Sequence, residues 1–539
     1  MTKQRTRAIG IVAFCSAKVR LSVALLRSKR RQWCYYEVHP VDTSTFVIHL
    51  HKSKLMPHLF RQTCFFGNLF FFALALAFAE RTHADFVIYR LPGTKLVTVL
   101  EGKTKILAGR LLEYTHPTFG SMALNLDDAV IVKAPTRKEE FKRLLNQANK
   151  SKEVKDYLEA ASQALKRGLL KEFYECCSLA YRIEPENPTV KRLIETRRRV
   201  KQPLGDPAAV EQNLREGTNL TKLKVEVSSH YVLLHDTSDA RVGRKTRAQT
   251  RLELLETVFE SFFMKFALDG IVLAPPKEHM MVLLFSEEET FQRYSTLLAP
   301  ELKMAAGFWS PKDNISVFYD QGTTKQMMLM TDLVKDMQKN KLKLRGTAVS
   351  QEMAHLANSF ELLVKVAREE SDIEVVSHEA THQLAGNSGL MPRGIIGARW
   401  AHEGLASYFE TPSGAGWGGI GAVNQTRLAD YKIISRDPAR RNLELIISDR
   451  LFYTAKNLGD AVEAYGQAWA LTYFLMETRF DKLMVYYQKC SQFENELPAS
   501  SRVKAFTEVF GDLRTLENEF NDFMALLKSD LDRIRDAAR

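Results

Sequence analysis

The pattern of apolar and polar residues changes character along the chain. From Asp85 to about Pro135, short apolar runs with β-branched residues are separated by turn-forming Pro-Gly and Glu-Gly pairs, which is typical of strands joined by tight turns. The next 65 or so residues place their apolar positions at the helical period instead. We therefore predict a small β domain at 85–135, followed by a helical hairpin at 136–200.

The predicted hairpin resembles one tetratricopeptide-like repeat. The resemblance rests on Ala160 to Ala164, Gly168-Leu169, Ala180 and the turn from Pro185 to Pro188. A single repeat has no neighbours of its own kind to bury its faces, so we expect the hairpin to pack on the adjacent domains. Residues 201–222 are rich in Pro and Gly and are predicted to form a linker.

The remainder of the chain begins with strands and continues with helices. Val225–Leu234 and Met280–Phe285 have strand character, and a helical pattern at 252–266 lies between them. Helical patterns dominate from about residue 332 onward. This order is typical of an α+β fold, which we predict for residues 223–499, with a C-terminal helical cap at 500–539.

Within the helical part, the sequence His-Glu-Ala-Thr-His at 378–382 matches the zinc-binding pattern H-E-x-x-H. Ser371 to Glu374 match a capping box that would start a helix, and Gly386-Asn387 would end it. On such a helix, residues four apart share one face. His378 and His382 can therefore direct two imidazoles at one zinc ion, while Glu379 is placed to act as the general base.

A catalytic zinc site needs a third protein ligand. The metzincin extension is excluded because Ala385 and Ser388 stand where its Gly and third His would be. The segment 400–410 precedes Thr-Pro and is predicted to form a second helix, on which Glu403 is our choice of ligand. His402 is the competing candidate, but adjacent helical residues point about 100° apart, so only one of the two can bind the same ion.

These residues resemble the gluzincins, the thermolysin-like and aminopeptidase-N-like zinc peptidases. Trp400, Glu403, Gly404 and Ala406 match their W-x-x-E-G-x-A segment, in which the glutamate is the third ligand. The chain looks most like the peptidase-MA-like proteins of uncharacterised function from secreted bacterial chains, over residues 223 to 530. The resemblance implies a zincin-like catalytic domain that uses one Zn²⁺ ion to hydrolyse peptide bonds.

The same resemblance suggests further site residues. Tyr465 begins a segment similar to one in which a tyrosine hydroxyl stabilises the oxyanion, a role that favours the transition state. Tyr465 also fits an aromatic core helix, and Tyr453 and Tyr408 are alternatives. Ser407, four residues after Glu403, is our candidate to orient a ligand histidine.

The substrate is predicted from what the chain lacks as well as from what it contains. The G-x-M-E-N signature of aminopeptidases is missing, so an endopeptidase is expected rather than an aminopeptidase. Gly307, Phe308 and Trp309 precede an alternating run and could form an edge strand that pairs with an extended peptide. A simple hairpin with a buried Phe-Trp pair is the alternative.

Charge argues against a nucleic-acid partner. The chain carries a formal net charge of +12, but residues 1–84 hold thirteen Lys and Arg against three Asp and Glu. The remainder has 63 basic and 61 acidic residues and is nearly neutral. It therefore lacks the basic surplus that a nucleic-acid-binding domain carries. We expect a peptide or protein substrate instead.

The basic N-terminal segment also contains the longest apolar run, at 65–79. This run is short for a membrane span and is followed by Thr82-His83-Ala84, which fits a signal-peptidase site. We predict that residues 1–84 are a leader and signal peptide, with Met56 as a possible true start, and that the mature chain is exported. Retention of the run as an N-terminal membrane anchor is the alternative.

After residue 84 the only cysteines are Cys176, Cys177 and Cys490. An odd number that includes an adjacent pair does not provide a disulfide framework or a sulfur metal site. The sequence therefore predicts a secreted zinc metallopeptidase whose fold depends on its core. A catalytically silent zincin-fold scaffold of the cell envelope is the competing hypothesis.

Overall fold

The computed structural model describes two short strands and most of the chain from Asp85 to Ala537. In that stretch it leaves out 91–96, 108–110, 242, 301, 303–304, 344–347, 394–396, 414–415, 438 and 494–496. The chain divides into two units, Met1–Thr82 and His83–Arg539. The predicted signal segment 65–79, the cleavage site at Ala84 and the alternative start Met56 lie outside the described residues.

The first unit contains an antiparallel pair, β1 (Tyr35–Asp42) and β2 (Thr45–His51). Across the helices that the structure describes, none is both long enough and apolar enough to cross a bilayer. Cleavage of a signal peptide and retention of an N-terminal anchor therefore both stay predictions.

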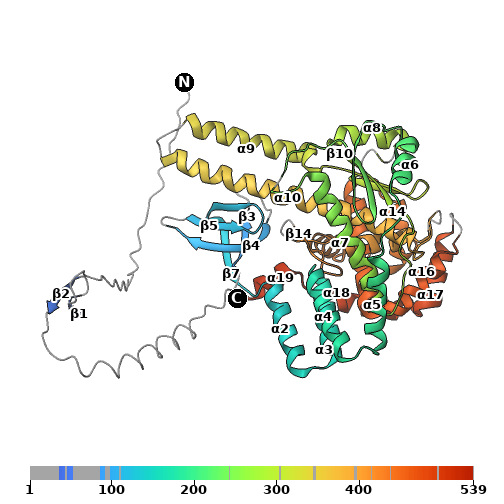
Figure 1. Cartoon of the computed structure of the whole chain (residues 1–539), viewed down its shortest axis with the longest axis horizontal. Coiled ribbons are helices and arrows are strands. Elements are labelled where there is room, and N and C mark those ends of the chain that lie inside the picture. The colour runs from blue at the N-terminus through green and yellow to red at the C-terminus, as the bar shows by residue number, and fades with distance from the viewer. Residues whose placement is uncertain are drawn as a thin grey trace. The chain divides into compact units, whose positions relative to one another are not determined.

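The second unit begins with a five-stranded antiparallel sheet in the segment predicted to form strands (Figure 1). The strand order is β6-β5-β4-β3-β7, and β5 alternates half-buried and buried residues, as expected for a sheet with one face on a core. The strands are β3 (Asp85–Arg90), β4 (Val97–Ile106), β5 (Leu111–His116), β6 (Gly120–Asn125) and β7 (Ala129–Lys133).

The expectation of one helical hairpin at 136–200 is wrong, because the segment forms four helices. A left-handed residue, Lys152, ends the first of them, and Gly168, at φ +72°, lies between the second and third. The predicted linker also contains a helix, α6 (Ala208–Thr218), whose Leu214 is fully buried. The four helices are α2 (Arg137–Ser151), α3 (Val154–Lys166), α4 (Leu170–Ile183) and α5 (Pro188–Val200).

A second, mixed sheet has the order β11-β12-β10-β9-β8. Its three central strands are parallel to one another and almost fully buried, as expected for strands covered on both faces. The outer strands pair antiparallel with their neighbours, so β11 forms one edge. The strands are β8 (Lys224–Val227), β9 (Tyr231–His235), β10 (Met280–Phe285), β11 (Gly307–Ser310) and β12 (Ile315–Tyr319).

Two long helices, α9 (Lys325–Lys343) and α10 (Ala348–Asn387), lie side by side (Figure 1). The capping box predicted at Ser371 is wrong, because α10 begins 23 residues earlier and passes through that position. Its predicted end at Gly386-Asn387 is confirmed. Leu362 and Val366 of α10 complete the core of the β3–β7 sheet, so one helix connects that sheet to the segment with the histidines.

The predicted second helix is confirmed as α11 (Arg399–Phe409), and it packs closely on α15 (Leu458–Thr478). The architecture is a mixture of helices and small sheets, which is compatible with the predicted α+β class. Whether the predicted segments fold as separate domains stays a prediction. The other elements are α7 (Arg247–Leu268), α8 (Glu288–Leu298), β13 (Pro412–Ser413), β14 (Gly416–Trp417), α12 (Gln425–Ile434), α13 (Leu443–Ile447), α14 (Arg450–Tyr453), α16 (Phe480–Cys490), α17 (Ala499–Phe510), α18 (Leu513–Leu526) and α19 (Asp530–Ala537).

Candidate metal centre

Helices α10 and α11 bring His378, His382 and Glu403 together. The Nε2 atoms of the two histidines are 3.2 Å apart. Oε2 of Glu403 lies 3.2 Å from Nε2 of His378 and 3.4 Å from Nε2 of His382. The three residues form a group that could hold a metal ion, and we call them the metal group.

The spacing of these donor atoms fits a tetrahedral ion. Two atoms that each bind zinc at about 2.1 Å with a tetrahedral angle lie about 3.4 Å apart, which matches the three distances in the triangle. The donor set of two imidazoles and one carboxylate is also typical of catalytic zinc sites. Three protein ligands leave the fourth tetrahedral position available to a water molecule or a substrate.

The competing ligand, His402, is not part of this group. His402 and Glu403 are adjacent on the helix, so their side chains point in directions about 100° apart. Burial, followed by the nearby His382, lowers the pKa of His402 to about 4. The structure therefore places Glu403, rather than His402, with the paired histidines.

Hydrogen bonds from two side-chain amides, Gln383 and Asn387, fix the last turns of α10 against the mixed sheet. The Gln383 side chain is fully buried; its Nε2 donates to the carbonyls of Met281 and Asn314, and its Oε1 accepts from Ser316. Asn387 donates to Oδ1 of Asn314 at 2.8 Å. These contacts set the rotation of α10 about its axis, and with it the direction of both histidines.

An ion-pair cluster holds α10 at a point two turns before His378. Asp372 is only 2% exposed, accepts from Arg251 at 2.5 Å and from the Gln321 backbone N–H at 3.0 Å. The cluster joins α7, α10 and the turn before α9 with three arginines and three carboxylates. Its members are Arg247, Arg251, Arg368, Asp320, Glu369 and Asp372.

Helix α11 is positioned from its N-terminal end by Asp449, a residue without a local sequence signal. The two carboxylate oxygens of this buried residue each accept from a backbone N–H, those of Arg399 and Trp400, at 2.8 Å. Trp400 is itself buried and stacks on Tyr486. The Trp of the W-x-x-E segment therefore anchors the helix in the core instead of contacting the metal group.

The packing around Gly404 gives a physical reason for the glycine of that segment. A Cβ atom at this residue would lie 2.1 Å from Oγ1 of Thr472 and 2.6 Å from the carbonyl oxygen of Ala468. Helices α11 and α15 therefore approach each other more closely than any larger residue would allow. This approach holds the adjacent Glu403 at its distance from α10.

The residue that orients a ligand histidine is Glu410, which the sequence analysis did not identify. Nδ1 of His378 lies 2.7 Å from Oε2 of this fully buried carboxylate. Since a carboxylate accepts, Nδ1 carries the proton and Nε2 is left for the metal, an arrangement common among zinc-binding histidines. Ser407 does not have the predicted role, because its buried hydroxyl lacks a hydrogen-bond partner among the described residues.

Glu410 is held in turn by Asn424 and Arg427, which donate to its Oε1 at 3.2 and 2.6 Å. Arg427 also donates to Glu374 on α10. Burial disfavours a charged carboxylate here, but the guanidinium of Arg427 and the hydrogen bond from His378 outweigh it and lower the pKa of Glu410 to about 2. The carboxylate is therefore ionised at neutral pH.

Glu379, the predicted general base, is buried beside the group. Burial raises its pKa above the ordinary value of 4.5, although the charges of His378 and His382 oppose this. A Cβ atom at Gly307 would lie 3.3 Å from Cγ of Glu379. The carboxylate therefore lies between the paired histidines and the edge strand β11.

Tyr465 lies at the metal group, and the two alternative tyrosines do not. Its ring centre is 6.1 Å from that of His378, and the Glu403 carboxylate and burial raise its pKa well above 10. The hydroxyl of buried Tyr408 donates to Glu477, and Tyr453 is 61% exposed and pairs with Arg502. Tyr465 occupies the interior of α15 rather than its start, which differs from the expectation.

The edge strand β11 presents alternate faces to the core and to the metal group. Phe308 is buried and packs on Phe291, whereas the Trp309 ring is stacked with the His382 ring at 6.4 Å and 14°. A buried Phe-Trp pair is therefore not formed. Gly307 and Trp309 instead border the metal group, and β11 is the outermost strand of the mixed sheet among the described residues.

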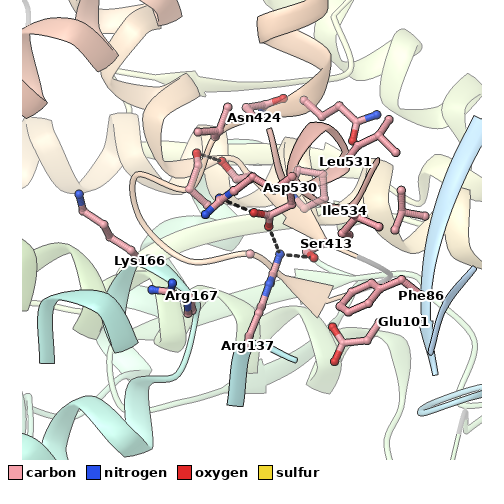
Figure 2. A pocket seen from close by; sticks show the side chains of 18 of the residues that line it. Phe86, Glu101, Arg137, Lys166, Arg167, Ser413, Asn424, Asp530, Leu531 and Ile534 are labelled. Atoms are coloured by element: carbon pink, nitrogen blue, oxygen red, sulfur yellow. Dashed lines mark hydrogen bonds and ion pairs between the residues drawn. The ribbon is translucent and has the colours of Figure 1, made fainter. Parts of the chain in front are cut away.

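A separate cavity of about 710 Å³ lies among α2, α3, α19, the β3–β7 sheet and the segment 411–426 (Figure 2). None of the three candidate ligands lines it. Figure 2 shows Arg137 at its centre, where it contacts Ser413 and Asp530. Asn424 lies on its wall and donates to Glu410, so only one hydrogen bond separates the cavity wall from the residue that orients His378.

The comparisons with known proteins cover the same region. A family model described as a protein of unknown function (DUF1570) matches residues 372–495. This stretch contains the three candidate ligands, His378, His382 and Glu403. It also contains Glu379, Glu410 and Tyr465. No curated protein and no solved structure matches the chain. The chain is thus similar to this family over the segment that forms the metal group, and the resemblance to gluzincins stays a prediction.

Proposed function

We propose that the protein is a zinc-dependent metallopeptidase of the gluzincin type that cleaves peptide bonds within peptide or protein substrates. The observation that carries the proposal is the triangle of His378, His382 and Glu403, with donor atoms 3.2 to 3.4 Å apart and a buried glutamate beside it. A structural zinc site would instead use four protein ligands.

The ion would be held by Nε2 of both histidines and by the Glu403 carboxylate, and when bound it would supply Lewis-acid activation of water and of the substrate carbonyl. Glu379 then accepts the proton of the attacking water and passes it to the departing amine. Its raised pKa favours this exchange, because a general base works best when its pKa approaches the working pH.

Tyr465 and β11 complete the proposed site. The Tyr465 hydroxyl remains protonated at neutral pH because its pKa is raised, so it can donate a hydrogen bond to the oxyanion that forms in the transition state. An extended substrate would add to the outer edge of β11 through its main chain. Gly307 allows a close approach there, since it lacks a side chain between the strand and Glu379.

The test is a comparison of wild-type protein with Glu379→Gln after loading with zinc. We expect one zinc ion in each, cleavage of a proteome-derived peptide library by the wild type, and none by Glu379→Gln. Since Glu379 is not a ligand, its replacement leaves metal binding intact. A wild type that binds zinc and cleaves none of the library would support the silent scaffold instead.

Export and zinc identity are separate proposals with their own measurements. Sequencing the N-terminus of the protein recovered from its native location distinguishes cleavage near Ala84 from a retained anchor. Metal analysis of protein purified without added metal distinguishes zinc from other divalent ions.

A further inference from the structure

Arg399 lies on the rim of the candidate metal centre. It is the first residue of α11, and its Nε is 3.8 Å from Oε1 of Glu403, the oxygen that faces away from the histidines. Its guanidinium lies 5.0 Å from the ring centre of Phe452. That ring in turn contacts the Tyr465 ring edge to face at 5.5 Å. The arginine therefore stands beside Tyr465, on the wall that also carries the third ligand.

The guanidinium of Arg399 has N–H groups that make no hydrogen bond among the described residues. Its approach to Glu403 is too long for a hydrogen bond, and within the described ranges its side chain does not donate to any acceptor. The side chain of Arg399 is 45% exposed. That of Arg427 is 13% exposed and donates hydrogen bonds to Glu410 and Glu374. The two arginines thus differ: one is part of the protein's own network, and the other faces solvent.

Helix α11 gains little stability from a cation at this position. The positive end of the helix dipole disfavours a basic residue in the first turn. The backbone N–H of Arg399 is already capped by Asp449. Stacking on Phe452 contributes only about 0.5 to 1 kcal/mol at an exposed site. Arg399 does act on two neighbouring carboxylates, Glu403 and Asp449. Its side chain nevertheless stays 45% exposed, so the guanidinium can still bind a group that arrives from solvent.

We infer that Arg399 binds a carboxylate of the substrate, so that the protein prefers substrates with a negative charge close to the scissile bond. This inference rests on the proposed function and names a substrate class for it. When a metal ion is bound, Glu403 shares its charge with the ion, and the half-exposed guanidinium of Arg399 remains as a cation beside the metal group. The planar fork of a guanidinium matches a carboxylate with two parallel hydrogen bonds.

The carboxylate could belong to an acidic side chain or to the C-terminus of the substrate. These two sources share one recognition chemistry, and substrates can separate them. Cleavage that requires a free C-terminus and stops on amidation identifies the terminal carboxylate. Cleavage that survives amidation and falls when Glu or Asp is replaced by Gln or Asn identifies the side chain.

The decisive measurement does not depend on turnover. Two hydroxamates are compared by calorimetry on zinc-loaded protein, one with a carboxylate and the other with a carboxamide at the same position. We expect wild-type protein to bind the carboxylate probe about 10- to 100-fold more tightly, as for a hydrogen-bonded charge pair. Arg399→Gln should abolish this ratio, and Arg399→Lys should restore part of it.

Arg182→Gln is the matched control, because it removes one exposed arginine from α4, a helix that contributes no metal ligand. It should leave the ratio unchanged. Equal affinities of the wild type for both probes, or an unchanged ratio in Arg399→Gln, would overturn the inference. A ratio that depends on Arg399 in a protein that cleaves nothing would instead overturn the proposed hydrolytic function and leave the carboxylate site standing. Zinc content and melting temperature verify that each variant is folded.

Discussion

The carboxylate of Glu410 lies 2.7 Å from Nδ1 of His378 and fixes the ring so that Nε2 faces Glu403. This contact joins the C-terminal cap of α11 to the last third of α10. It makes the geometry of the metal group depend on a residue that does not belong to it.

Replacement of Glu410 should weaken metal binding without removing a ligand. We expect Glu410→Gln to lower zinc affinity about 10- to 100-fold, the usual effect of losing a carboxylate partner of a ligand histidine. Competition with a chelator of known affinity measures the change. Ser407→Ala is the control and should bind zinc as the wild type does, because the Ser407 hydroxyl has no partner within the described structure. A loss of affinity in Ser407→Ala would restore our original assignment.

Removal of the Tyr465 hydroxyl should affect turnover and not metal content. In Tyr465→Phe the ring that contacts His378 and Phe452 remains, but the donor to the oxyanion is lost. The expected fall in kcat is about 10²- to 10³-fold, as for the loss of one oxyanion donor. Steady-state kinetics with a cleaved library peptide measure it. Tyr453→Phe should change nothing, and equal rates for all three proteins would place Tyr465 in the core alone.

Gly404 and Gly217 give opposite predictions for the same substitution. Gly404→Ala forces a methyl group to 2.6 Å from the Ala468 backbone and should destabilise the fold by about 1 to 3 kcal/mol, with a loss of zinc affinity as Glu403 moves. Gly217 lies in α6 with open space around its Cβ position, so Gly217→Ala should stabilise by about 0.5 to 1 kcal/mol. Thermal unfolding compares both with the wild type. Two similar shifts would show that α11 and α15 do not meet as described.

The ion-pair cluster predicts how stability depends on acid. Burial raises the pKa of Asp320, but its contacts with Arg247 and Arg368 outweigh this and lower it from 3.8 to about 2. A lowered pKa contributes stability that is present above pH 3.8 and is lost as the pH falls towards 2, about 2 kcal/mol in all. In metal-free protein, the difference in melting temperature between wild type and Asp320→Asn should therefore shrink from pH 5 to pH 2.5.

Asp332→Asn serves as the control for that experiment, since Asp332 is 61% exposed on α9 and pairs with the exposed Lys335 one turn away. Its melting temperature should follow that of the wild type at every pH. A constant difference for Asp320→Asn would mean that Asp320 keeps its ordinary pKa.

The local parts of the site could be predicted from the sequence, because they follow from helical spacing. His378 and His382 share a face through their i, i+4 relation, and Glu403 lies on a helix whose end at Thr411-Pro412 is visible in the chain. The start of α10 could not be placed, because Ser371 to Glu374 match a capping box in a region where the helix continues. Asp372 in that match is used by Arg251, far away in sequence.

The residues that support the ligands were missed for a related reason. Glu410 meets His378 across 32 positions, and Asp449 caps α11 from 49 to 50 positions away. Neither distance has a helical or strand period. One signal was present: α11 begins with Arg399 and is followed by Glu410 at its C-terminal cap, the reverse of the charges that a helix dipole favours. Such a reversal suggests that both residues serve something other than the helix.

The 40-residue length of α10 has a practical consequence for anyone who shortens this protein. A fragment that starts where the family match begins, at residue 372, would cut that helix and strip Asp372 of its arginine partners. It would also discard Leu362 and Val366 together with the sheet on which these two residues pack. Recombinant versions meant to retain the candidate metal centre should therefore keep everything from Asp85 onward, and a soluble shorter piece should be assayed for metal binding before its inactivity is interpreted.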